Sequence, residues 1–180
     1  MLTNRGIKFE DIDHYLNVSE SDNLSPLLLK NIESAAKMIF NQLSKDSFHI
    51  HVQVDSDCDG YTSAALLLNY IHAVFPSAIS HISYSFHDGK IHGINPELIP
   101  SETSLVIAPD SSSNDYDIHK ALHDKGIEVL VLDHHQAERI SEYACVVNNQ
   151  LCDYPTKSLS GVGVVYKLCQ FIDSLLPADQ

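Results

Sequence analysis

The stretch Phe48-His49-Ile50-His51-Val52-Gln53-Val54-Asp55-Ser56-Asp57-Cys58-Asp59-Gly60 decides both the fold and the chemistry of this chain. Its first half, residues 48–54, alternates apolar and polar side chains and predicts a β-strand. Three carboxylates follow the strand directly, and like charges that close raise one another's pKa unless a cation neutralises them. Oxygen ligands in a tight group suit Mg²⁺ or Mn²⁺. We therefore predict a strand that ends in a metal site.

Two further groups of candidate ligands close predicted strands elsewhere in the chain. Asp110 follows the apolar run 104–108, and Asp133-His134-His135 follows the apolar run 127–132. In open α/β sheets, ligands bind beyond the carboxyl ends of the strands. Three separate segments thus deliver carboxylates and imidazoles to one edge of a sheet, a pattern that favours a metal-dependent enzyme.

The order of apolar runs and turn signals predicts an α/β fold. Short apolar strands that alternate with helices are typical of a mostly parallel sheet with helices on both faces. We expect a helical lead-in over residues 1–45 and an α/β core over residues 46–180, in one domain. The predicted strands are 48–54, 78–86, 104–108, 128–132 and 144–147, and the predicted helices are 8–17, 25–43, 61–75, 114–125 and 160–176.

Composition narrows the functional classes. The chain has 180 residues, 44% hydrophobic and 19% charged, which is ordinary for a globular protein. Apolar runs fall far short of the roughly 18 residues of a membrane span, and the start lacks the apolar stretch of a secretory signal. We therefore expect a cytoplasmic protein with no membrane partner. The net charge of −13 argues against a bare nucleic-acid-binding module, but bound dications reverse the local sign in an enzyme acting on phosphate esters.

Five segments together resemble the DHH phosphoesterase superfamily, and most closely the N-terminal catalytic domain of RecJ-type single-stranded-DNA-specific exonucleases. The acidic run resembles the D-x-D-x-D-G motif of that branch, and the triplet at 133–135 gives the superfamily its name. The resemblance spans nearly the whole chain with order and spacing preserved. Its segments are residues 2–7 (Leu-Thr-Asn-Arg-Gly-Ile), 55–60, Asp110, 133–135 and 154–164 (Tyr-Pro-Thr-Lys-Ser-Leu-Ser-Gly-Val-Gly-Val).

The resemblance implies a function. It implies 5′-to-3′ exonuclease activity on single-stranded DNA, assisted by two ions of Mn²⁺ or Mg²⁺, in DNA repair and recombination. A phosphatase or phosphodiesterase acting on short oligonucleotides or small nucleotides is an alternative within the same chemistry. A truncated, non-catalytic binding domain is the alternative from another class.

Two departures from the family pattern support the alternatives. The family carries a further metal-binding aspartate on a strand after the 160–163 helix start, but only Asp173 and Asp179 follow here, and neither has that context. The family's C-terminal substrate-binding domain is also absent from the 180 residues, so we expect a fragment or a short relative.

The resemblance also implies roles for individual residues. The predicted metal ligands are Asp55, Asp57, Asp59, Asp110 and His134, with Asp110 bridging two ions; Asp110, His134 and His135 form the catalytic set; Asp133 fixes the loop or an imidazole tautomer; and the predicted substrate contacts are His135, His92, Lys157, Ser160, Gly161 and Gly163.

Each role has a plainer interpretation. The acidic run is also what a helix start favours, since carboxylates stabilise helix N-termini. Gly161 and Gly163 suit close packing of a helix on a sheet as well as phosphate binding at a helix start. Lys157 is more readily interpreted as a plain surface lysine. His119 and His123 have a metal-binding i, i+4 spacing, but we expect them on an exposed helix face.

Overall fold

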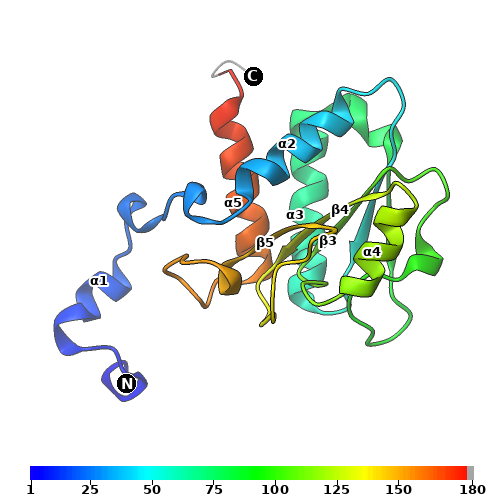
Figure 1. Cartoon of the computed structure of the whole chain (residues 1–180). Helices are drawn as coiled ribbons and strands as arrows, with labels where there is room; N and C mark the ends of the chain where they lie inside the picture. Colours follow the sequence, from blue (N-terminus) through cyan, green and yellow to red (C-terminus); the bar gives the residue numbers. More distant parts are fainter. Residues whose placement is uncertain (178–180) are drawn as a thin grey trace.

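The computed structural model describes residues 1–177 and contains a sheet in which every neighbouring pair of strands is parallel (Figure 1). The order of its five strands is β2-β1-β3-β4-β5. The predicted α/β class, parallel sheet and strand count are confirmed. The strands are β1 (Ile50–Val54), β2 (Ile82–Phe86), β3 (Leu105–Pro109), β4 (Glu128–Asp133) and β5 (Cys145–Asn148).

Helices cover both faces of the sheet, as predicted. On one face, α2 (Ile32–Leu43), α3 (Cys58–Val74) and α5 (Gly161–Leu175) enclose the larger core, which takes Ile107 and Leu130 from the central strands. The alternate residues Val106 and Val129 belong to a second, smaller core beneath α4 (Tyr116–Asp124). Burial of both faces explains why the central strands are almost wholly apolar. Within residues 1–177, none of the helices has the length and apolar character that crossing a bilayer requires.

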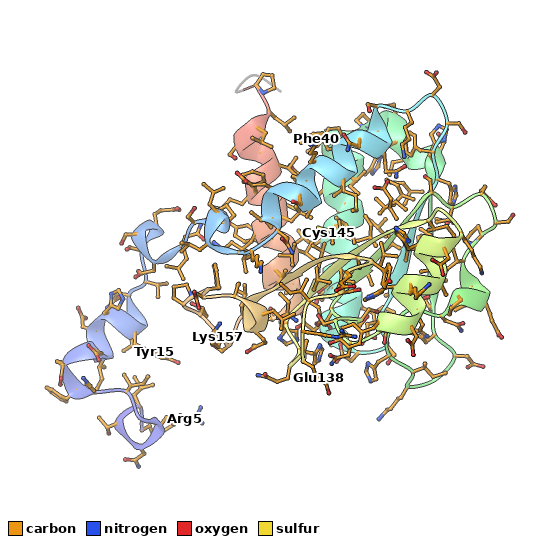
Figure 2. The ribbon with its side chains drawn as sticks, viewed as in Figure 1. Arg5, Tyr15, Phe40, Glu138, Cys145 and Lys157 are labelled. Carbon is orange, nitrogen blue, oxygen red and sulfur yellow. The ribbon has the colours of Figure 1, made fainter. Side chains whose placement is uncertain are left out.

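The helical lead-in is more broken than predicted. The expected helix 8–17 is reduced to η2 (Phe9–Asp11) and α1 (Ile12–Leu16), flanked by the short turns η1 (Thr3–Arg5) and η3 (Glu20–Asp22). This arm extends away from the sheet, and Figure 2 shows Arg5 and Tyr15 on it. No lead-in residue before position 29 is buried, so an apolar helical spacing alone did not give a stable helix here.

The predicted helix 25–43 is two elements. A 3₁₀ turn, η4 (Pro26–Leu28), precedes α2, and Asn31 between them has a left-handed backbone with φ 69°. Asn31 also donates from Nδ2 to the Val146 carbonyl oxygen at 2.9 Å, while Leu29 is fully buried. Anchoring the chain on β5 therefore interrupts the helix.

The predicted strand 78–86 begins later than expected. Pro76 starts a 3₁₀ segment, η5 (Pro76–His81), and β2 begins at Ile82. Proline preorganises the first turn of a helix and donates no backbone hydrogen bond, which accounts for the shift. The other elements lie within a few residues of their predicted bounds, and the short turns η6 (Pro96–Leu98) and η7 (Asn149–Leu151) complete the fold.

The expectation of an exposed face for His119 is wrong. His119 has no exposed surface, because α4 packs on the sheet through His119 and Leu122, which lie one turn apart. His123, one turn further along the helix, is exposed as predicted. Burial also lowers the pKa of His119, so the neutral imidazole is favoured inside the smaller core.

Polar side chains on β1 hold the loop that follows β2. His51, which is buried, shares hydrogen bonds with the hydroxyls of Ser83 and Ser85 on β2. Gln53, two residues further along β1, accepts a hydrogen bond from the backbone N–H of Asn95 at 3.3 Å. The His51 contacts join β1 to β2, and the Gln53 contact ties the loop after β2 to β1 at Asn95.

Candidate metal centre

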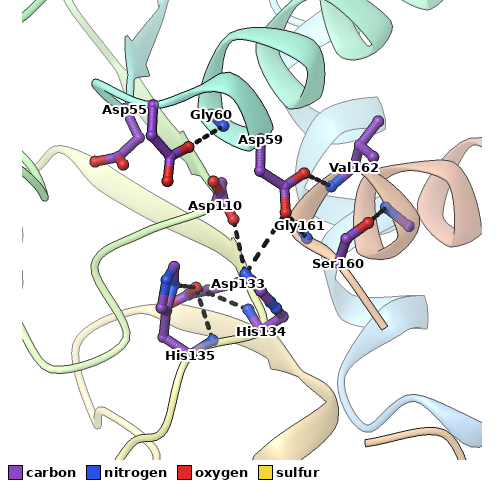
Figure 3. Close-up of polar contacts among 12 residues, drawn as sticks. Asp55, Asp59, Gly60, Asp110, Asp133, His134, His135, Ser160, Gly161 and Val162 are labelled. Carbon is purple, nitrogen blue, oxygen red and sulfur yellow. Dashed lines mark hydrogen bonds and ion pairs between the residues drawn. The ribbon is translucent and has the colours of Figure 1, made fainter. Parts of the chain in front are cut away.

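The carboxyl ends of β1, β3 and β4 bring the candidate ligands together, as predicted (Figure 3). Ligand atoms of two sets of three residues lie within 4.8 Å of one another. Asp110 belongs to both sets, and Asp59 belongs to neither. The first set is Asp55, Asp57 and Asp110, and the second is Asp110, His134 and His135.

Asp110 is the centre of this arrangement. Its side chain is completely buried, and neither carboxylate oxygen accepts a hydrogen bond. Nε2 of His134 lies 3.2 Å from Oδ1. Burial, followed by the charges of Asp59 and Asp57, raises the pKa of Asp110 to about 8. A buried carboxylate that accepts no hydrogen bond and lies among other carboxylates is strongly disfavoured unless a cation joins it, so the residues present fit a divalent metal.

Two glycines allow helices to approach these acids. A Cβ on Gly161, at the start of α5, would lie 2.1 Å from Oδ1 of Asp110. A Cβ on Gly60, in the first turn of α3, would lie 2.6 Å from Cβ of Asp55. The close-packing interpretation of Gly161 is therefore the one that the contacts favour, and the packed neighbour is a candidate ligand.

Asp133 organises the turn that follows β4. Its Oδ1 accepts hydrogen bonds from the backbone N–H groups of His134 at 2.7 Å and His135 at 3.1 Å, and from Nδ1 of His135 at 2.8 Å. Its Oδ2 accepts from the N–H of Ser113. Burial alone would raise the pKa of Asp133, but these bonds outweigh it and lower the pKa to about 2. The bond to Asp133 raises the pKa of His135 to about 9. These contacts match the positioning role predicted for Asp133.

Asp55 forms a second carboxylate–imidazole pair. Its buried carboxylate accepts from Nδ1 of His92 at 2.7 Å and from the N–H of Gly93 at 3.3 Å. His92 thus lies at the site, as its predicted substrate role requires, but its contact with Asp55 had no signal in the sequence. Asp57 caps α3, with Oδ1 accepting from the N–H of Gly60 at 3.0 Å, and this bond lowers its pKa. The helix accordingly begins at Cys58 rather than at Tyr61.

Asp59 holds the start of α5. Its two carboxylate oxygens accept from the N–H groups of Gly161 at 2.8 Å and Val162 at 2.9 Å, and Oγ of Ser160 accepts from Gly163 at 3.2 Å. The first three N–H groups of the helix therefore have protein partners (Figure 3). Binding of a phosphate by these groups would require displacement of the partners, so the substrate roles of Ser160, Gly161 and Gly163 stay predictions, as does ligation of a metal by Asp59.

We expect Asp59→Ala to lower the free energy of unfolding by about 1–2 kcal/mol, the usual cost of losing a helix cap. The reason is that two N–H groups at the start of α5 lose their acceptors. Thermal and urea unfolding with EDTA present would measure this, since chelation removes any contribution from a metal. Asp117→Ala, at an exposed aspartate of α4, is the control. Equal stability of the two variants would show that Asp59 does not hold α5.

The hydrogen bonds of Lys157 indicate a structural role. Its ammonium donates to the backbone carbonyl oxygens of Asn149, at 2.7 Å, and Cys152, and so closes the loop between β5 and α5 (Figure 2). With these bonds in place its predicted phosphate contact has no direct support. Asp173, on α5, was the other aspartate considered as a ligand. Its carboxylate instead accepts a hydrogen bond from the hydroxyl of Tyr70 on α3, at 2.6 Å. Asp179 lies outside the described residues.

A polar cavity of about 380 Å³ opens beside the centre. His92, Asp110, Asp133 and His135 line it together with the Ser111–Ser113 loop. The sequence did not identify this loop as part of a cavity, and Ser112 within it has a positive φ of 80°. Asp115, which directly precedes α4, accepts from the N–H of Ile94 at 3.1 Å and holds the His92 loop at the rim.

Curated relatives are similar to this chain in sequence. A putative SPbeta prophage-derived single-strand DNA-specific exonuclease, YorK, of Bacillus subtilis is 45% identical over 177 residues, which is 98% of this chain and 30% of that protein. The single-stranded-DNA-specific exonuclease RecJ of Bacillus subtilis is 27% identical over 170 residues, 91% of this chain and 21% of the relative. The chain thus spans less than a third of the length of these curated relatives.

Solved structures and a family model agree on the fold. A crystal structure of exonuclease RecJ bound to manganese matches with a TM-score of 0.72 at 24% identity, covering 87% of this chain and 41% of the other. RecJ of Thermus thermophilus in complex with Mn²⁺ matches with a TM-score of 0.68 at the same identity of 24%. The model of the DHH family, N-terminal domain, matches residues 47–179. With the DHH turn and its neighbouring carboxylates at one sheet edge, the chain belongs to the DHH family.

Proposed function

We propose that residues 1–180 form one DHH phosphoesterase domain that hydrolyses phosphodiester bonds of single-stranded DNA from the 5′ end, with two Mn²⁺ or Mg²⁺ ions. The observation that carries the proposal is Asp110, whose buried carboxylate accepts no hydrogen bond and belongs to both sets of candidate ligands. Two-metal hydrolases need a shared ligand of this kind. The names of the relatives, which describe single-strand DNA-specific exonucleases, supply the substrate.

The residues of the site would have different roles in this reaction. Asp55, Asp57, Asp110 and His134 would hold the ions. When bound, these ions supply charge for the phosphoryl oxygens and activation of a water molecule. Asp133 fixes Nδ1 of His135 at 2.8 Å, which leaves Nε2 as the nitrogen that can donate to a substrate oxygen at the cavity. The glycines let α3 and α5 approach and shield the acids.

The net charge of −13 supports a short substrate as the second candidate. Long single strands are usually held by positively charged grooves, whereas a cavity of about 380 Å³ is near the lower end of small-ligand sites. A phosphodiesterase acting on dinucleotides or small nucleotides would use the same centre.

One incubation series separates these possibilities. The protein with Mn²⁺ is given a 5′-labelled single strand, the matching duplex and a dinucleotide, and products are resolved by electrophoresis and chromatography. We expect mononucleotides from the single strand and none from the duplex. Cleavage of the dinucleotide alone would replace the exonuclease by the second candidate. Absence of all cleavage, with no Mn²⁺ binding by calorimetry, would leave a non-catalytic domain.

We expect Mn²⁺ affinity to rise with pH and to level off above about pH 8. The pKa of Asp110, raised to about 8 by burial, keeps its carboxyl protonated at neutral pH in the metal-free protein, so the metal must displace a proton. Affinity then increases by up to about tenfold per pH unit below that value. Titration calorimetry in buffers of different ionisation enthalpy would measure the released proton.

The raised pKa of Asp110 also determines how the free energy of unfolding changes with pH. A carboxyl with a raised folded pKa favours the folded state at low pH, and this contribution is lost as pH rises from about 4 to about 8. Mn²⁺ should therefore stabilise the protein most at the upper end of this window. Proton release that persists unchanged in Asp110→Asn would assign the titration to another group.

A further inference from the structure

An exposed aromatic cluster lies beside the candidate metal centre. Tyr61 in the first turn of α3 stacks on Phe86, the last residue of β2, with ring centroids 5.4 Å apart and planes at 22°. Tyr84 meets the edge of Phe86 at 5.5 Å. The three rings are 48%, 49% and 56% exposed for Tyr61, Phe86 and Tyr84 respectively. Large rings held together at the surface mark an interaction site more often than isolated apolar residues do.

The cluster forms the wall of a groove between α3 and β2. The groove encloses about 250 Å³, and its floor comes from small and aliphatic residues of α3, namely Ala64, Ala65 and Leu68. No charged side chain lines it among the described residues. That volume is below the usual range of small-molecule pockets, roughly 300–1,000 Å³, so the groove suits one planar ring.

The groove lies next to the candidate ligands Asp55 and Asp57 along the chain. Val54, which lines it, is the register partner of Phe86 and directly precedes Asp55. The N–H of Tyr61 donates to the carbonyl oxygen of Asp57 at 3.0 Å. The candidate ligands Asp55 and Asp57 therefore lie in the chain between two residues of the groove, while the polar cavity opens beside Asp110.

We propose that Tyr61, Tyr84 and Phe86 form a stacking platform for the bases of a single-stranded nucleic acid that extends from the metal centre. Stacking on aromatic side chains accepts every base, because each has a π-face. A duplex would not fit, since its bases already stack on one another. This inference rests on the proposed function and adds to it the surface that holds the strand.

Charge supports stacking as the source of affinity. The chain carries 11 lysines and arginines against 24 aspartates and glutamates, and the groove has no cationic side chain among the residues described. Backbone phosphates contribute salt-dependent affinity through such cations. The platform is therefore expected to bind bases with a weak dependence on salt and with little sequence preference.

The test compares a labelled oligothymidylate with an abasic strand of equal length and charge. Binding is followed by fluorescence anisotropy in EDTA, where metal-dependent cleavage cannot consume the strand. We expect the wild-type protein to bind the base-bearing strand about tenfold more tightly, in the range of one stacked base. Tyr61→Ala and Phe86→Ala should bind both strands with the same, weaker affinity.

Two sets of variants keep the result interpretable. Tyr61→Leu and Phe86→Leu retain apolar area without an aromatic face, so they should fold normally and still lose the preference for bases. Tyr166→Ala, at a tyrosine of α5 that is 46% exposed and lies outside the groove lining, should keep it. A melting curve of each variant verifies folding.

Three results would overturn the platform. The first is equal binding of both strands by the wild-type protein, and the second is an unchanged preference for bases in the leucine variants. The third is loss of self-association in Tyr61→Ala, measured by sedimentation, which would assign the groove to a second copy of the chain. Cleavage with Mn²⁺ is scored separately. A base preference without any cleavage would contradict the proposed function and leave the platform standing.

Discussion

Asp110→Asn should abolish Mn²⁺-dependent hydrolysis and at the same time make the metal-free protein more stable. The proposed activity depends on a carboxylate that both ligand sets share, and its loss should remove several kcal/mol of charge stabilisation, at least about 10³-fold in rate. Stability should rise by a few kcal/mol at pH 8, because the amide fills the same buried space without a charge. Asparagine also tolerates the left-handed backbone at this position, where φ is 68°.

The measurements are a single-turnover cleavage assay with Mn²⁺ and urea unfolding with EDTA across pH 6 to 9. Asp117→Asn, at an exposed aspartate of α4, should change neither quantity. Opposite signs for activity and stability are what distinguish a functional carboxylate from a structural one. A variant at position 110 that is both inactive and destabilised would mean that the carboxylate mainly supports the fold.

Gly161→Ala should disrupt the metal centre, although glycine carries no ligand atom. The added Cβ would lie 2.1 Å from Oδ1 and 2.7 Å from Cβ of Asp110. Either α5 or Asp110 must shift, so we expect Mn²⁺ affinity to fall by at least about tenfold and stability to fall by about 1–3 kcal/mol, a usual cost of overpacking. Calorimetric titration with Mn²⁺ and thermal unfolding would measure the two effects.

Gly163→Ala is the matched control, two residues further along the same helix turn. Its added Cβ would meet the flexible end of the Leu159 side chain, at 2.6 Å from Cδ1, and not a ligand. Alanine also gains up to about 1 kcal/mol of helix propensity over glycine at either position, so the difference between the variants isolates the contact with Asp110. Equal Mn²⁺ affinity in both would show that the clash is relieved without moving the ligand.

Local patterns predicted the parallel sheet and the position of the candidate ligands, because strand ends of a parallel sheet share an edge. They failed where a distant contact competed with the local preference. Asn31 leaves the helical conformation to bond with β5, and His119 is buried although we expected it on an exposed helix face. The contact of Asn31 is with Val146, and His119 is buried by packing of α4 on the sheet, so both outcomes depend on residues distant in the chain. No local pattern therefore predicts them.

The sequence by itself determined the α/β class, the placement of Asp55, Asp57, Asp110 and His134 at one edge, and the DHH signature, since periodicity and strand-end chemistry are local properties. Only the tertiary structure decided what the carboxylates do. Asp59 and Asp110 are both acids that follow strands, but Asp59 accepts hydrogen bonds from the N–H groups of α5, whereas Asp110 accepts none. The physical reason is that a carboxylate's role depends on which donors the fold brings to it and how far water is excluded.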